Sequence, residues 1–225
     1  MKTIVFDLDN TLYDEWLFLR EAFLKVSEYL GNKFGRGAEE VFQLLVEIYE
    51  SHDRTFPIFD ELLARLGAPR EEIGKVLELY YSSGEDVRPY EDAEEVLEQL
   101  SRKHELLLLT EGRPELQRRK LRSLGLERFF REVVIIDESF GKVHRKPSPL
   151  PFLRLLEGRR ASETVYVADN PFKDFLAPNR LGIFTVRVQR GIYARYPNEA
   201  VLYEMRPKVT VKSLRELTDL LRGGP

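Results

Sequence analysis

Two aspartates separated by one leucine stand at the end of an apolar run near the start of the chain. They are Asp7 and Asp9 in the stretch "IVFDLDNTLYDE" at 4–15. Side chains two residues apart in a strand point to the same face, so both carboxylates are expected on one side. Each negative charge opposes the ionisation of the other. A divalent cation between the two carboxylates would make such a pair tolerable.

Further polar residues follow three other apolar segments. In chain order the candidates are Thr11 after the first segment, Thr110, Glu111 and Gly112 after the second, Lys146 beyond the third, and Asp169, Asn170 and Asp174 after the fourth. Each residue alone has an ordinary explanation as a turn former, a helix cap or a solvated side chain. The carboxyl ends of parallel strands share one edge of an open α/β sheet, where ligands bind. The combination therefore predicts one site.

The residue types at this edge suit phosphate chemistry. Oxygen ligands from Asp7, Asp9 and Asp169 suit Mg²⁺, which also binds a phosphate oxygen of a substrate. The hydroxyl of Thr110 and the ammonium group of Lys146 can hold the remaining phosphate oxygens. One aspartate can attack phosphorus and form an aspartyl phosphate, which is a known route of covalent catalysis.

Alternating strand and helix patterns predict the elements that position these residues. Compact apolar runs, typical of strands covered on both faces, lie at 3–8, 105–110, 132–136, 164–168 and 183–188, with a last short strand at the start of 209–221. Helical patterns lie at 92–103, where Asp92 is the N-cap candidate, at 114–125, and after Ser213, which is expected to cap the last helix. This alternation predicts a doubly wound parallel α/β sheet.

Helical periodicity interrupts the alternation after the first strand. Four helix-like segments rich in Leu, Phe and Tyr fill the region from Asp14 to about residue 86. The chain is therefore expected to hold an α/β core domain at 1–13 and 88–225 with an inserted helical domain at 14–87. A chain of 225 residues is long enough for two modest domains.

Composition excludes several classes of protein. The net charge of −3 gives no general attraction to nucleic acid or anionic membranes. The strongest basic run, "RRKLR" at 118–122, is interpreted as the solvated face of a helix. The chain has no cysteine, which excludes disulfides and thiolate metal sites. No signal-peptide pattern and no apolar run of about 20 residues is present, so a cytoplasmic location is expected.

The four segments together resemble the haloacid dehalogenase (HAD) superfamily of hydrolases. The sequence "DLDNT" (7–11) is similar to the first motif of the family, "LLLLT" (106–110) to the second, "RKP" (145–147) to the third and "VYVADNPFKD" (165–174) to the fourth. The helical insertion after the first motif resembles the C1-type cap, which closes over the active site in that family. The resemblance implies a Rossmann-like HAD core and a phosphatase-type hydrolase.

The resemblance also implies a role for each site residue. Asp7 would be the nucleophile, and Asp9 the general acid and base. Mg²⁺ would be bound by the Asp7 side chain, the Asp9 backbone carbonyl and Asp169, and Asp174 would support or join this set. Phosphate-binding roles fall to Thr110 and Lys146, with Glu111 and Gly112 beside the substrate, and supporting roles fall to Thr11 and Asn170.

Other functions remain open at the level of sequence. The second aspartate of the first motif favours phosphoryl transfer over a 2-haloacid dehalogenase, whereas a β-phosphoglucomutase-like phosphomutase shares all four motifs. A non-catalytic binding module is disfavoured because so many clustered charges are retained. The expected substrate is a small phosphorylated metabolite, for which Arg20, Arg54 and Arg113 are candidate anion contacts. The expected assembly is a monomer or homodimer.

Overall fold

The computed structural model describes residues 2–52 and 56–223, so that Arg54 lies outside the described residues. This part of the chain divides into two compact units. The first unit comprises Met1–Glu15 and Val87–Pro225, and the second comprises Trp16–Asp86. The second unit is thus an insertion directly after the loop that carries Asp7 and Asp9. Among the described residues, no helix combines the length and the apolar character that crossing a bilayer requires.

A parallel sheet forms the centre of the first unit, as the sequence predicts. Within the described residues its six strands have the order β3-β2-β1-β4-β5-β6. The strands are β1 (Thr3–Phe6), β2 (Glu105–Thr110), β3 (Glu132–Ile135), β4 (Thr164–Ala168), β5 (Phe184–Val188) and β6 (Val209–Val211). The chain first moves outward from β1 on one side and then returns to β4 on the other. The resulting α/β fold is doubly wound, and its switch point lies between β1 and β4.

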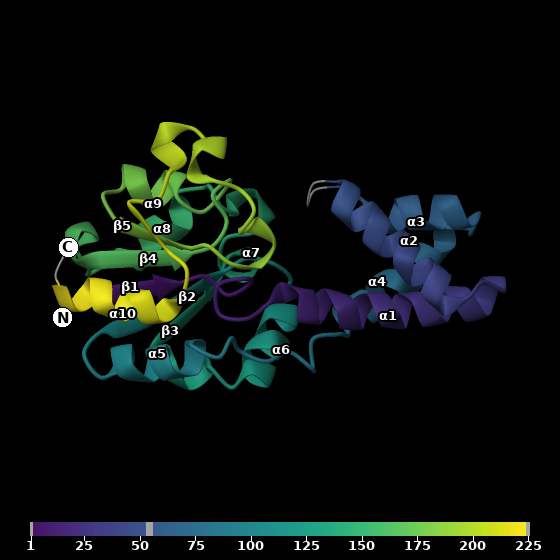
Figure 1. Ribbon diagram of the computed structural model, residues 1–225, viewed down its shortest axis with the longest axis horizontal. Helices are drawn as coiled ribbons and strands as arrows, with labels where there is room; N and C mark the ends of the chain where they lie inside the picture. Colours follow the sequence, from purple (N-terminus) through teal and green to yellow (C-terminus); the bar gives the residue numbers. More distant parts are fainter. Residues whose placement is uncertain (1, 53–55, 224–225) are drawn as a thin grey trace. The chain divides into compact units, whose positions relative to one another are not determined.

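Burial on both faces explains why these strands are almost continuously apolar. The central strand β1 is buried at every position, and β4 is buried throughout as well. In β1, Ile4 lies opposite Leu106 of β2 and Val165 of β4. Helices cover both faces of the sheet: α5 and α6 lie on one side, and α8 and α9 on the other (Figure 1). Such covering is typical of parallel sheets.

Three helices of the first unit lie close to the predicted ranges, whereas the short helices at Ile136–Ser139, Leu150–Leu155 and Leu176–Arg180 were not predicted. The helices of this unit are α5 (Ala93–Ser101), α6 (Pro114–Leu124), α7 (Ile136–Ser139), α8 (Leu150–Leu155), α9 (Leu176–Arg180) and α10 (Leu214–Gly223). Helix α6 begins at a proline and ends before Gly125, whose φ of +66° is left-handed. The hydroxyl of Ser213 accepts the N–H of Glu216 at 3.4 Å and caps α10. Asp92 is the N-cap residue of α5, as predicted, but its carboxylate makes no capping hydrogen bond and binds Arg190 and the N–H of Leu214 instead.

Four helices, counted over the described residues, build the second unit around an aromatic core. They are α1 (Glu15–Phe34), α2 (Ala38–Ser51), α3 (Ile58–Leu66) and α4 (Ile73–Tyr81). The ring of Phe23 packs edge-on against Phe59 and Tyr49, and Phe59 packs against Tyr80. Edge-to-face contacts of this kind add to the stabilisation from burial alone. Single 3₁₀ turns complete the chain at Arg70–Glu72, Glu127–Phe129, Lys142–His144, Ala161–Glu163, Gly191–Tyr193, Asn198–Ala200 and Tyr203–Met205.

Candidate active site

A tight turn after β1 presents the first aspartates at the carboxyl edge of the sheet. The backbone N–H of Asp7 donates to the carbonyl of Val167 in β4 at 2.9 Å, which continues the ladder to the end of the strand. Asn10 has a φ of +57°, and its side chain donates to Glu15 at 3.0 Å. Gly191 approaches so closely that an added Cβ would lie 2.6 Å from the Asn10 side chain. The turn therefore requires glycine at 191, which no local pattern predicts.

Three buried carboxylates meet beside this turn. Asp7, Asp169 and Asp174 each offer an oxygen atom within 4.8 Å of the oxygens of the other two. Burial, together with the neighbouring Asp174 and Asp7 charges, raises the pKa of Asp169 well above its usual value. Burial likewise raises the pKa of Asp7 to about 7, against the pull of Lys146. Such a group of anions is unfavourable unless protons or a cation compensate it.

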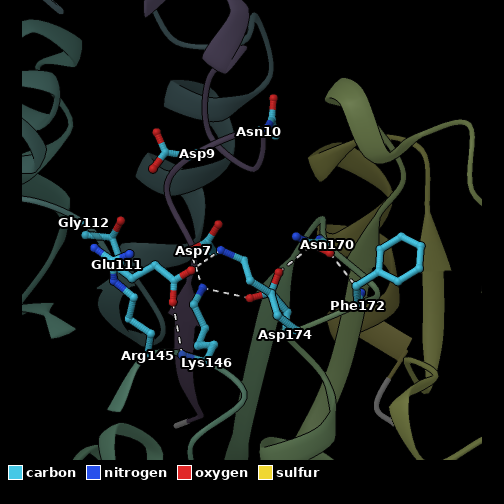
Figure 2. Close-up of polar contacts among 12 residues, drawn as sticks. Asp7, Asp9, Asn10, Glu111, Gly112, Arg145, Lys146, Asn170, Phe172 and Asp174 are labelled. Carbon is cyan, nitrogen blue, oxygen red and sulfur yellow. Dashed lines mark hydrogen bonds and ion pairs between the residues drawn. The ribbon is translucent and has the colours of Figure 1, made fainter. Parts of the chain in front are cut away.

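Lys146 supplies one positive charge within the cluster. Its Nζ atom lies 2.6 Å from Asp7 Oδ1 and 2.8 Å from Asp174 Oδ1 (Figure 2). The same atom lies 3.0 Å from the hydroxyl of Tyr166. Burial would lower the pKa of this lysine, but Asp174 and Asp7 raise it well above its usual value. A charged lysine is therefore fixed against the oxygen of Asp7 at the end of β1. Tyr166, which sequence reasoning missed, also donates to Asp174 at 3.1 Å.

Glu111 links the loop after β2 to two other loops of the site. Its carboxylate accepts the backbone N–H of Lys146 at 3.1 Å and pairs with the Nζ atom of Lys173. Burial alone would raise the pKa of Glu111, but Lys173 and Lys146 lower it. The acidic residue that follows Thr110 is thus already neutralised by cations of this chain, which explains how it can lie close to an anion site.

Gly112 continues the same loop in a conformation that favours glycine. Its φ is +130°, and its N–H donates to Asp137 Oδ1 at 3.3 Å. The same carboxylate accepts the Nε of Arg145 at 2.7 Å. Because Arg145 directly precedes Lys146, this contact ties the position of the lysine to the backbone of the loop after β2.

The Asp9 carboxylate makes its contacts outside the buried cluster. It accepts the Nζ of Lys120 at 2.7 Å, the Nε2 of Gln117 at 2.9 Å and the hydroxyl of Tyr13. Burial would raise the pKa of Asp9, but the charge and hydrogen bond of Lys120 and the bonds from Tyr13 and Gln117 lower it to about 2. Figure 2 shows this side chain apart from the linked group of Asp7, Lys146 and Asp174. The two aspartates of the first motif therefore occupy contrasting environments.

Lys120 and Gln117 are site residues that the sequence analysis missed. The interpretation of 118–122 as a solvated helix face is wrong for Lys120, whose side chain is 3% exposed. A usable signal was present, because Lys120 lies four residues from both Leu116 and Leu124, which are buried. Residues four apart share one face of a helix, so the position itself predicts burial.

The loop after β4 positions the remaining predicted residues. The hydroxyl of Thr11 donates to Asp169 Oδ1 at 3.4 Å, which joins the first loop to the fourth. The backbone N–H of Asn170 donates to Asp174 Oδ2 at 3.0 Å and fixes that carboxylate. Arg187, a fully buried residue of β5 that sequence reasoning also missed, donates to the backbone carbonyl of Asp169 at 3.1 Å.

The structure thus brings most of the predicted residues to one edge. Asp7, Lys146, Asp169 and Asp174 form its buried centre, and Thr110 is joined to Asp9 through Gln117. The Arg113 side chain is 56% exposed and faces Glu115 at 4.0 Å, and Arg20 is exposed in the second unit. These two arginines therefore stay predictions as anion contacts.

The chain is similar in sequence and in fold to several phosphatases. The chain is 32% identical over 232 residues to a glyceraldehyde 3-phosphate phosphatase of Methanopyrus kandleri, covering 96% of this chain and 98% of the relative. It is 33% identical over 164 residues to a phosphoserine phosphatase of Thermus thermophilus, covering 71% of this chain and 62% of that protein. A crystal structure of a HAD phosphatase from Thermococcus onnurineus matches with a TM-score of 0.65 and 26% identity, covering 99% of each chain.

A sequence profile agrees with both the relatives and the fold. The profile of the haloacid dehalogenase-like hydrolases matches residues 4–188. This stretch begins in β1 and ends with β5, so it includes all four loops that form the site. The chain therefore belongs to the haloacid dehalogenase-like hydrolase family.

Proposed function

We propose that the protein is a Mg²⁺-dependent phosphomonoester hydrolase that transfers a phosphoryl group to Asp7. The observation that carries this proposal is the buried arrangement of Asp7 with Lys146, Asp169 and Asp174 at the switch point of the sheet. It combines an anionic nucleophile, a fixed ammonium group and two further carboxylates. The phosphatases among the relatives support the same class of reaction.

The residues present fit a magnesium ion. Among the described residues, Oδ2 of Asp169 is buried without a hydrogen-bond partner, although buried oxygens normally have one. Its neighbours are hard carboxylate oxygens, which Mg²⁺ prefers. Asp7 and Asp169 would hold the ion through their side chains, Asp9 through its backbone carbonyl, and Asp174 directly or as a support. The bound ion would neutralise negative charge where the nucleophile meets the phosphate.

The reaction follows from the protein groups in two displacements. An oxygen of Asp7 attacks phosphorus, the bond to the ester oxygen breaks, and Asp9, which takes up a proton when the substrate is bound, gives that proton to the leaving oxygen. Water then attacks the aspartyl phosphate, Asp9 takes the water proton, and inorganic phosphate leaves Asp7 free again. Thr110 and Lys146 hold the other phosphate oxygens throughout.

We propose glyceraldehyde 3-phosphate as the substrate, because the relative with that name matches nearly the full length of both chains. Phosphoserine is the second candidate, since the phosphoserine phosphatase relative matches over a shorter part of each chain. The helical unit is proposed to act as the cap that selects between such substrates.

Measurement of phosphate release tests the proposal directly. Purified protein is incubated with glyceraldehyde 3-phosphate, phosphoserine or p-nitrophenyl phosphate, with Mg²⁺ and with excess chelator. We expect phosphate release only with Mg²⁺, and the highest kcat/KM for glyceraldehyde 3-phosphate. Failure to release phosphate from any monoester with Mg²⁺ would overturn the proposal. Halide release from a 2-haloacid, or isomerisation of a sugar phosphate without phosphate release, would identify the two rival reactions.

A further inference from the structure

Two side chains that bind the Asp9 carboxylate come from α6, a helix that lies outside the four family motifs. Lys120 contributes an ammonium group 2.7 Å from Asp9 Oδ1, and Gln117 an amide nitrogen 2.9 Å from Asp9 Oδ2. Both α6 side chains are almost fully buried, with residue exposures of 2% for Lys120 and 3% for Gln117. Lysine is rarely buried in this way unless it is paired, because desolvation of its charge is unfavourable.

We infer that Lys120 and Gln117 are positioning residues for the acid–base group of the reaction, an inference that rests on the proposed function. The two side chains bind different oxygens of the Asp9 carboxylate, so together they fix both its location and the rotation of its plane. The hydroxyl of Tyr13 donates to the same oxygen as Lys120. A carboxylate held at both oxygens has little freedom to leave the position from which it serves the leaving oxygen.

Gln117 also determines how Thr110 presents its hydroxyl group. Before substrate binds, Asp9 is an ionised carboxylate paired with Lys120 and only accepts hydrogen bonds, so the amide nitrogen of Gln117 must face it. The same nitrogen lies 2.6 Å from the hydroxyl oxygen of Thr110 and donates its second proton there. Because that oxygen accepts from Gln117, the proton of Thr110 points elsewhere and is available to a phosphate oxygen. One amide thus aligns the general acid and the phosphate-binding hydroxyl.

A specific kinetic signature follows from this arrangement. Protonation by Asp9 matters most when the leaving oxygen is basic, and least when the leaving group is a stable anion such as p-nitrophenolate. Misplacement of Asp9 should therefore slow phenyl phosphate more than p-nitrophenyl phosphate. Loss of general structural integrity would slow both substrates alike.

The test compares Lys120→Met with Arg118→Met, a matched change on the same helix. Arg118 is exposed and pairs with Glu138 at 2.6 Å, away from the buried face. We expect Lys120→Met to lower kcat for phenyl phosphate by about 10- to 100-fold, the size expected for a misplaced catalytic group, with a smaller loss for p-nitrophenyl phosphate. Arg118→Met should leave both values unchanged. Equal losses for the two substrates in Lys120→Met would overturn the inference.

A double-mutant cycle with Asp9→Asn gives the second arm of the test. If Lys120 acts through Asp9, the double variant should be no slower than Asp9→Asn alone. A further loss equal to that of Lys120→Met alone would show that the lysine acts independently and would contradict the inference. If Lys120→Met does not fold, Gln117→Met is measured in its place and is expected to show the same leaving-group dependence.

The wild-type protein separates failure of this inference from failure of the proposed function. Hydrolysis of both aryl phosphates by the wild type supports the phosphatase function, whatever the variants do. The ratio of kcat for phenyl phosphate to kcat for p-nitrophenyl phosphate in the variants then tests only the role of the α6 side chains. A wild type without any phosphatase activity would overturn both.

Discussion

The two units of the chain differ in whether charged side chains are buried. In the α/β unit, Asp7, Lys120, Lys146, Asp169 and Asp174 are all buried near the carboxyl edge of the sheet. Among the described residues of Trp16–Asp86, the buried polar side chains are those of Ser27 and Ser83, and no charged residue is buried. The helical unit keeps its ion pairs partly or fully exposed, as for Arg65 with Glu61.

This difference suggests a criterion for telling side chains that serve the reaction from side chains that serve folding. Burying a charge is unfavourable even when it is paired, and an apolar core of the same volume is often more stable. The helical unit shows that this chain can build such a core from Leu, Phe and Tyr. The charges buried around Asp7 therefore require a functional explanation, which the proposed phosphoryl transfer provides.

The largest expected effect is on the nucleophile. Asp7→Asn should lower kcat by at least about 10⁴-fold, because an amide oxygen is a poor nucleophile, while circular dichroism and the melting temperature show an intact fold. Asp9→Asn and the wild type are assayed in parallel with p-nitrophenyl phosphate. Retention of even a tenth of wild-type turnover by Asp7→Asn would rule out covalent catalysis by this residue.

A somewhat smaller effect is expected at the acid–base residue. Asp9→Asn should lower kcat by roughly 10²- to 10⁴-fold, the usual contribution of general acid–base catalysis. Steady-state rates with an alkyl phosphate measure the loss, and Glu115→Gln on exposed helix surface serves as the control. An unchanged rate in Asp9→Asn would contradict the role of Asp9 as the general acid and base.

Core and surface substitutions in the helical unit should differ in their effect on stability. Leu45 is fully buried in α2, so Leu45→Ala should lower the free energy of unfolding by about 2 to 5 kcal/mol. Arg65→Ala, which removes the ion pairs of Arg65 with Glu61 and Glu47 at the surface, should lower it far less. Urea unfolding measures both values. If the two variants lose similar amounts of unfolding free energy, the apolar core is not the main source of stability in this unit.

The response to Mg²⁺ should depend on pH in a defined direction. The raised pKa values of Asp7 and Asp169 mean that the metal-free folded state retains protons which the unfolded state has lost above about pH 4. Its stability therefore falls as the pH rises toward 7, whereas Mg²⁺ binding becomes easier because fewer protons compete. We expect Mg²⁺ to raise the melting temperature more at pH 8 than at pH 5.5.

Differential scanning fluorimetry measures this shift, with Asp169→Asn as the control. That variant should lose most of the Mg²⁺-dependent increase at both pH values, because it lacks one carboxylate ligand. A shift of equal size at pH 5.5 and pH 8 would contradict competition between protons and the cation.

The sequence predicts much of this molecule because its strongest signals are local. The strands at β1, β2 and β4 are recognisable because burial on both faces selects continuous apolar runs. Asp7 and Asp169 are recognisable because each directly follows such a run, and Lys146 is recognisable from the "RKP" stretch at 145–147 beyond the third run. Once the sheet topology is known, the shared edge brings them together without further information.

Partners that lie far apart in the sequence could not be predicted in this way. Asp92 is at the predicted N-cap position, but folding places Arg190 beside it, and its carboxylate forms this ion pair in place of a capping hydrogen bond. Lys120 looks like part of a basic surface until the burial of its helix face is considered. The close approach of Gly191 to Asn10 depends on two loops that lie near opposite ends of the chain. Such contacts depend on tertiary packing rather than on local sequence.

Detection of a phosphorylated enzyme would test the role of Asp7 most directly. Asp9→Asn should accumulate the intermediate, because water attack on the aspartyl phosphate lacks its base. The variant is mixed with p-nitrophenyl phosphate and Mg²⁺, quenched in acid and digested for mass spectrometry. We expect the mass of one phosphoryl group on the peptide containing Asp7, and its absence in Asp7→Asn. Turnover without a phosphorylated peptide, or a phosphoryl group on another residue, would contradict the account.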